Sequence, residues 1–205
     1  MAIRPPLFFI LFFIAFSLLP SLSRAQAPWY DPCTNPNWIT PGTSCTNTSA
    51  AMWNATQTSG IGAYCGAPTN AVDVWFSFTA KSTNPSINLS SMGSRMDDNP
   101  RLQIFSGSCG ALTSLSCVSG TNTATLSLSA TGLTVGTNYL VRVFTTATAA
   151  TAGVAADWNF NICIVDPPPA NDNCAGSVLL TAGTSCVNTT GNVYGSTVSA
   201  PAIAP

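Results

Sequence analysis

Histidine and glutamate are both absent from this chain of 205 residues. The absence of histidine excludes a Ser-His-Asp triad and a Cys-His pair, and it removes the commonest general base and metal ligand. A glycosidase can work with aspartate alone, but it needs two carboxyl groups that face one bond. The sequence offers only the adjacent Asp97 and Asp98 as such a pair. We therefore predict that the chain is not an enzyme and needs no catalytic cofactor.

Charged residues are also scarce. They make up 6% of the chain, against about 25% in average soluble domains, and no segment gathers lysine and arginine into a basic patch. Nucleic-acid binding requires such clustered positive charge, so nucleic acid is excluded as a partner. Serine, threonine, asparagine and glycine supply the polar surface instead. A neutral surface rich in hydroxyl groups suits an extracellular protein.

The one long apolar run lies near the N-terminus, from Leu7 to Leu19, and is broken only by Ser17. Arg4 precedes the run, and the small residues Ser23 and Ala25 follow it. The run is too short for a membrane-spanning helix, which needs about 20 apolar residues. This arrangement predicts a secretory signal peptide over residues 1–25. We expect a secreted or cell-surface protein with no membrane span in the mature chain.

Apolar and polar residues alternate with a period of two in many segments, as in half-buried strands. In residues 73–79, Val74, Phe76 and Phe78 share one face, and Trp75 lies on the other. The same alternation recurs in runs that contain Ile87 and Leu89, Leu102 and Ile104, Leu126 and Leu128, Tyr139 to Val143, and Trp158 to Ile164. Turn-forming clusters separate the runs, and no helical period appears. The pattern predicts an all-β fold, an antiparallel β-sandwich or jelly-roll domain over residues 26–165.

A second, incomplete copy follows this domain. Residues 166–172 are rich in proline and are expected to form an extended linker. Residues 173–190 then repeat residues 32–49 with eight identities, including both cysteines. This partial repeat, residues 173–205, lacks counterparts of the strands that begin near Asp73. Either the chain belongs to a longer multi-repeat protein, or another molecule completes the tail.

The cysteines are expected to form disulfides, because the chain is predicted to be exported. They lack the close Cys-x-x-Cys spacing of a metal site. Six cysteines in one domain allow fifteen pairings, so the sequence alone does not fix the connectivity. Cys109 and Cys117 bracket a short segment between strands and are the first pair that we predict. The next choices join Cys45 to Cys65 and Cys33 to Cys163.

Two candidate binding sites stand out. Asp97 and Asp98, followed by Asn99, collect oxygen ligands in a loop and could hold calcium together with Asp73. The alternative is an ordinary polar turn, because Asp and Asn also satisfy turn backbone. Trp75 could stack on a sugar ring if it is exposed on the outer face of its strand. The alternative is that a neighbouring segment covers it.

Four motifs together resemble pre-peptidase C-terminal (PPC)-like domains. They are Asp73 to Ala80, Leu102 to Leu112, Gly136 to Val143, and the opening Asn171 to Cys174 of the second copy. The first three resemble successive core strands of these domains, and the fourth resembles the start of such repeats in secreted and surface proteins of Bacteroidetes-type bacteria. The resemblance implies a β-sandwich accessory module without catalysis of its own, which binds proteins, polysaccharides or cell surfaces.

The sequence is consistent with three functions. The first is a non-catalytic, exported surface or extracellular module for adhesion, whose partners are other surface proteins or glycans. The second is a structural subunit of an extracellular filament, in which the tail donates strands to another copy of the same chain. The third is an accessory domain of a secreted hydrolase whose catalytic part lies elsewhere.

Overall fold

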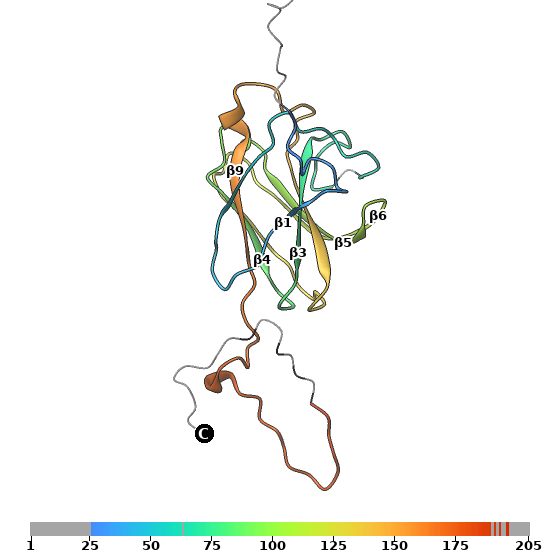
Figure 1. Cartoon of the computed structure of the whole chain (residues 1–205), viewed down its shortest axis with the longest axis vertical. Helices are drawn as coiled ribbons and strands as arrows, with labels where there is room; N and C mark the ends of the chain where they lie inside the picture. The colour runs from blue at the N-terminus through green and yellow to red at the C-terminus, as the bar shows by residue number, and fades with distance from the viewer. Residues whose placement is uncertain (1–25, 63, 190, 192, 194–195, 197–205) are drawn as a thin grey trace, which may run out of the picture.

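The structure is a computed structural model that describes residues 26–62, 64–189, 191, 193 and 196. Two β-sheets pack face to face in this part of the chain (Figure 1). The prediction of an all-β sandwich is therefore confirmed. The predicted signal peptide, residues 1–25, lies outside the described residues. Among the residues that are described, no helix has the length and apolar character needed to cross a membrane.

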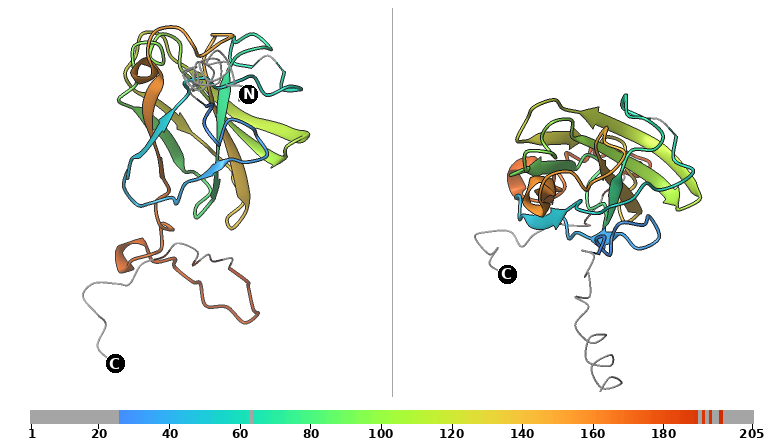
Figure 2. Two further views of the ribbon diagram at one scale, coloured as in Figure 1. Left: turned by 45° about the horizontal axis from the view of Figure 1, so that its top comes forward. Right: turned by 90° about the horizontal axis from the view of Figure 1, so that it is seen from above.

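The first sheet has five strands in the order β1-β3-β8-β5-β6. Their bounds are Asn37–Trp38, Asp73–Thr79, Asn138–Phe144, Arg101–Ser108 and Ala111–Ser119. All neighbours are antiparallel except β1 and β3, which run parallel. The β5–β6 hairpin lies at one edge of the sheet, and its tip extends beyond the other strands (Figures 1 and 2).

The second sheet has four antiparallel strands in the order β2-β9-β4-β7. Their bounds are Thr48–Ala51, Asn159–Val165, Ser86–Ser90 and Leu126–Ser129. A short 3-10 helix, Ala155–Trp158, leads into β9, and a second one, Cys174–Gly176, lies in the tail. Apart from the β5–β6 hairpin, consecutive strands lie in different sheets. For example, β1 joins the first sheet and β2 the second, although only nine residues separate them.

The core lies between the two sheets, and the period of two in the sequence explains its composition. Val74, Phe76 and Phe78 of β3 are fully buried in it. Phe160 and Ile162 of β9 face them from the second sheet. The rings of Phe76 and Phe160 meet edge to face with their centroids 6.1 Å apart. The alternate residues of each strand consequently point away from the core.

Three disulfides bond all six cysteines of the domain, as expected, but the predicted pairs are wrong. The bonds are Cys33–Cys109, Cys45–Cys163 and Cys65–Cys117. Their Cα atoms lie 5.9, 5.4 and 6.1 Å apart, respectively. Each bond therefore has a Cα separation that is normal for a disulfide.

Sheet topology explains why each predicted pair fails. Cys109 is in the turn between β5 and β6, whereas Cys117 is in β6 opposite Gln103. Six residues of β6 lie between the turn and Cys117, a distance of about 20 Å along the strand. Cys33 packs on the outer face of the first sheet, but Cys163 belongs to β9 in the second sheet.

The remaining predicted pair, Cys45 with Cys65, fails because the two cysteines lie beside different strands. Cys45 comes just before β2, the neighbour of β9, and bonds to Cys163 in that strand. Cys65 is in the loop over the outer face of the first sheet, where Arg101 Nε donates a hydrogen bond to its carbonyl oxygen at 2.9 Å. That loop is consequently bonded to β6 and not to the second sheet.

The predicted linker and second copy contain no strand among their described residues. Large apolar side chains of this tail are exposed, namely those of Val178, Leu179, Leu180, Val187 and Val193. Cys174 and Cys186 are exposed and unpaired.

Candidate binding site

Two loops cover the outer face of the five-stranded sheet. Trp75, Arg142 and Gln103 lie side by side on this face in neighbouring strands, and all three are buried. The cover consists of the N-terminal segment before β1 and the long loop between β2 and β3. Cys33–Cys109 and Cys65–Cys117 bond these segments to the β5–β6 hairpin. The cover is thus covalently attached to the sheet beneath it.

An ion pair lies under this cover. Arg142 Nη2 is 2.6 Å from Asp73 Oδ2, and both side chains are almost completely buried. Arg142 Nε also donates a hydrogen bond to Asp73 Oδ2 at 2.6 Å. The Arg142 guanidinium lies over the Phe144 ring, 4.2 Å from its centroid. The pair therefore joins β3 to β8 in a place that water does not reach.

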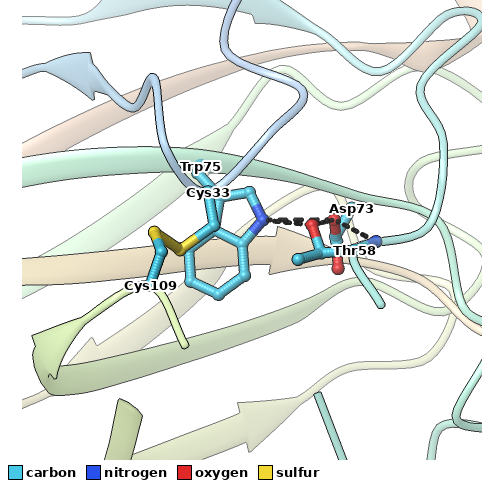
Figure 3. The surroundings of a disulfide bond; sticks show 5 residues. All are labelled: Cys33, Thr58, Asp73, Trp75 and Cys109. Atoms are coloured by element: carbon cyan, nitrogen blue, oxygen red, sulfur yellow. Dashed lines mark hydrogen bonds between the residues drawn. A yellow bond between two sulfur atoms is a disulfide. The ribbon is translucent and has the colours of Figure 1, made fainter. Parts of the chain in front are cut away.

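Thr58 connects the covering loop to Asp73 of this ion pair and to Trp75 (Figure 3). Its hydroxyl donates a hydrogen bond to Asp73 Oδ1 at 2.7 Å and accepts one from Trp75 Nε1 at 2.8 Å. Burial raises the pKa of Asp73, while Arg142 and the hydrogen bonds from Thr58 and Trp75 oppose that rise. Burial likewise lowers the pKa of Arg142, against the effect of Asp73. The hydrogen bond from Thr58 to the Asp73 carboxylate thus holds the covering loop against the sheet.

A cleft of about 640 Å³ opens between the covering loops and the tip of the β5–β6 hairpin. Tyr64, Phe105 and Leu112 give it an apolar wall, and Tyr64 meets Phe105 edge to face at 6.0 Å. Its polar lining consists of Asp31, Thr34, Thr56, Gln57, Thr58 and Ser59. The cleft is thus open and has one aromatic wall, and Asp31 is the one charged group among its described lining residues.

The walls of the cleft are held in place by specific contacts. Asp31 accepts hydrogen bonds from the Thr56 backbone N–H at 2.6 Å and from its hydroxyl at 2.7 Å. The Cys33–Cys109 disulfide lines the cleft and belongs to the apolar cluster around Trp75 (Figure 3). Gly110, in the turn beside Cys109, has φ 94°, which favours glycine. These contacts hold the two sides of the cleft in a defined arrangement.

Trp75 lies beneath the cleft and does not line it. Its side chain is fully buried and packs on Phe105 at 5.6 Å between ring centroids. The prediction that it lies on the outer face of β3 is correct, but the prediction of an exposed ring for sugar stacking is wrong. The segment before β1 and the β2–β3 loop cover it, and a sequence pattern within β3 carries no signal of that cover.

The predicted calcium site is not assembled around three carboxylates. Asp73 is engaged with Arg142, and the described residues contain no cluster of three acidic or cysteine side chains that could hold a metal. The carbonyl oxygens of Asp97 and Asp98 accept hydrogen bonds from the backbone N–H groups of Thr123 and Asn122, respectively, which join this turn to the loop between β6 and β7. Calcium at Asp97 and Asp98 stays a prediction; a rise in melting temperature with millimolar calcium would support it, and an unchanged value would contradict it.

The residues that form the cleft were not predicted. Residues 56–64 have no period, and Tyr64 and Thr58 carry no motif. The one available signal is Cys65, because a cysteine in an exported loop marks a segment that is attached elsewhere. Only the long-range pairing of the cysteines shows where this loop lies.

A family model described as galactose binding domain-like, from a group associated with the type IX secretion system (T9SS), matches residues 30–162. The match covers β1 to β8 and most of β9. No curated protein matches the chain. The matched family is a β-sandwich family like the PPC-like domains that the motifs resemble, but it is a different one.

Proposed function

The chain belongs to this T9SS-associated, galactose binding domain-like family, and on that premise we propose that it is an exported, non-catalytic module for adhesion that binds a glycan in the cleft over the five-stranded sheet. It acts outside the cell or at the cell surface. The three disulfides of the domain support that location, because such bonds persist in oxidising compartments. The PPC-like motifs are consistent with the same kind of module.

The composition of the cleft is the observation that carries this proposal. A sugar ring presents an apolar C–H face and a rim of hydroxyl groups. Tyr64, half-buried beside Phe105, offers an aromatic surface for the apolar C–H face. The hydroxyl and amide groups of Thr34, Gln57 and Ser59 offer hydrogen bonds to the hydroxyl groups of the sugar. Ligand sites commonly combine apolar walls with a few placed polar groups in a preformed hollow.

The carboxylates argue for binding without catalysis. Among the described residues that line the cleft, Asp31 is the only acidic one, and both of its oxygens accept hydrogen bonds from Thr56. Asp73 lies beneath the floor, where Arg142 and Thr58 engage it. Glycoside hydrolysis in its usual form requires two carboxyl groups on opposite sides of one bond. The described lining of the cleft supplies only one.

Tyr64→Ala is expected to weaken glycan binding about tenfold, because an aromatic contact contributes roughly 1.5 kcal/mol. The measurement is a screen of the mature protein on an array of galactose-terminated and other saccharides, followed by calorimetric titration of the best ligand. Trp38→Ala is the matched control, since Trp38 is an exposed aromatic outside the cleft and its loss should leave the affinity unchanged. Equal affinity of the Tyr64→Ala variant and the unmodified protein would refute the proposal.

A further inference from the structure

The tail repeats the backbone turns of the segment before β1, at the same offset of 141 residues as the sequence repeat. The Asp31 N–H donates to the Pro28 carbonyl oxygen at 2.9 Å, and the Asp172 N–H donates to that of Pro169 at 2.9 Å. Four residues later in each copy, Asn35 N–H bonds to Pro32 at 2.9 Å, and Gly176 N–H bonds to Asn173 at 2.9 Å. The local conformation of the first copy is therefore present in the tail.

A second contact is repeated around the second cysteine of each copy. The Cys45 sulfur lies 3.2 Å from Asn47 Oδ1, and the Cys186 sulfur lies 3.6 Å from Asn188 Oδ1. The sequence repeat aligns these two pairs of residues. The correspondence thus extends across both cysteines of the tail.

Burial differs sharply between corresponding apolar residues. Ile39 is 3% exposed in the core of the domain, but its counterpart Leu180 is 69% exposed. Met52 is fully buried, but its counterpart Val193 is 82% exposed. Leu180 and Val193 are both apolar and exposed. An exposed position does not require an apolar side chain. Such side chains suit a hydrophobic core, which the described residues of the tail do not form.

The first copy shows what surrounds these positions in a complete domain. Ile39 N–H donates to Ser77 of β3, and Met52 N–H donates to Trp158, just before β9. Cys33 bonds to Cys109 in the β5–β6 turn, and Cys45 bonds to Cys163 in β9. The two cysteines of this segment thus have partners in opposite sheets and do not bond to each other.

We propose that the tail, through its described residues 172–189, 191 and 193, supplies the first two strands of a second sandwich, and that its partner is a sandwich segment that lacks its own β1 and β2. That segment carries one free cysteine in its β5–β6 turn, which bonds Cys174, and one in its last strand, which bonds Cys186. In each bond two thiols lose two protons and two electrons, and a disulfide oxidant such as oxidised glutathione is reduced to two thiols. Leu180 and Val193 enter the core of the new sandwich.

A folded second copy of residues 26–165 does not fit this description of the partner. Its own residues 33–52 already occupy the two strand positions, and its Cys109 and Cys163 are already bonded. The tail would have to displace two strands and two disulfides. The acceptor is therefore a segment in which these positions are vacant.

The test joins the tail to a unit of known structure. Residues 26–193 are followed directly by a second copy of residues 53–165, and the protein is oxidised with glutathione. Peptide mapping is expected to join Cys174 to the appended counterpart of Cys109, and Cys186 to that of Cys163. The appended unit should then resist proteolysis. A bond between Cys174 and Cys186, or an appended unit that stays protease-sensitive, overturns the proposal.

Two matched chains sharpen this result. A chain with residues 31–52 in place of 172–193 is a tandem of the first domain and sets the reference for protease resistance. Leu180→Asp should abolish the resistance of the appended unit in the extended chain, and it should change nothing in the unextended chain, where Leu180 is exposed. Dimers of the unextended chain that are bonded through Cys174 and Cys109, with Cys33 released, would show exchange with a second copy and would also overturn the proposal.

Discussion

Removal of the Cys45–Cys163 disulfide, as Cys45→Ser with Cys163→Ala, is expected to lower the free energy of unfolding by about 5 kcal/mol. The reason is the length of the loop that this bond closes, since 118 residues separate the two cysteines. It is the longest of the three closures in the domain, so its loss gives the unfolded chain the most additional freedom. Equilibrium unfolding in urea measures the change. Small domains have a total stability of about 5–15 kcal/mol, so the variant should be close to unfolding.

The matched control for this variant is Cys174→Ser with Cys186→Ser. Both cysteines are exposed and unpaired in the tail, so their replacement should leave the urea midpoint unchanged. If the two double variants unfold at the same urea concentration as the unmodified protein, the Cys45–Cys163 bond does not hold the domain together.

Arg142→Met is expected to lower the free energy of unfolding by about 3–5 kcal/mol near neutral pH, because it leaves Asp73 buried without its cation. Burial already raises the pKa of Asp73, and loss of Arg142 should raise that pKa further. A carboxyl group whose pKa is raised on folding stabilises the fold below its unfolded pKa, and this contribution is lost as the pH rises through its folded pKa. The deficit should therefore shrink on acidification. Urea unfolding at about pH 7 and about pH 4 measures this dependence.

Two further variants distinguish a broken ion pair from lost packing. Asp73→Asn combined with Arg142→Met removes both charges, so it should recover most of the stability that the single change loses. Arg95→Met is the matched surface control and should change stability by less than about 0.5 kcal/mol, since Arg95 is exposed. A deficit in Arg142→Met that is independent of pH and persists in the double variant would contradict a role for the charge pair.

The strands that face the core could be predicted from the sequence because burial repeats locally. Val74, Phe76 and Phe78 alternate within β3, and the same rule locates β4, β5, β7, β8 and β9. It misses most of β6, Ala111–Ser119, where serine and threonine occupy many positions. This strand lies at the edge of its sheet with every residue at least partly exposed, so no apolar face is required of it.

The disulfides and the cleft depend on contacts between distant residues, and local patterns do not record those. Cys109 and Cys117 are near neighbours in sequence, yet a hairpin strand separates them. Cys33 and Cys45 are twelve residues apart, yet the chain crosses from one sheet to the other between them. Trp75 shows the same limit, because alternation places it on the outer face and only the tertiary structure covers it.

The most direct test of the binding site is an NMR titration of the mature protein with the saccharide that binds best on the array. Amide signals of residues 56–62 and 109–112 should shift, together with that of Tyr64, because these residues line the cleft. Signals of the Asp97–Asp98 turn and of the second sheet should stay in place. Shifts confined to that turn or to the second sheet, with the cleft unaffected, would contradict the proposal that this face of the sandwich binds the ligand.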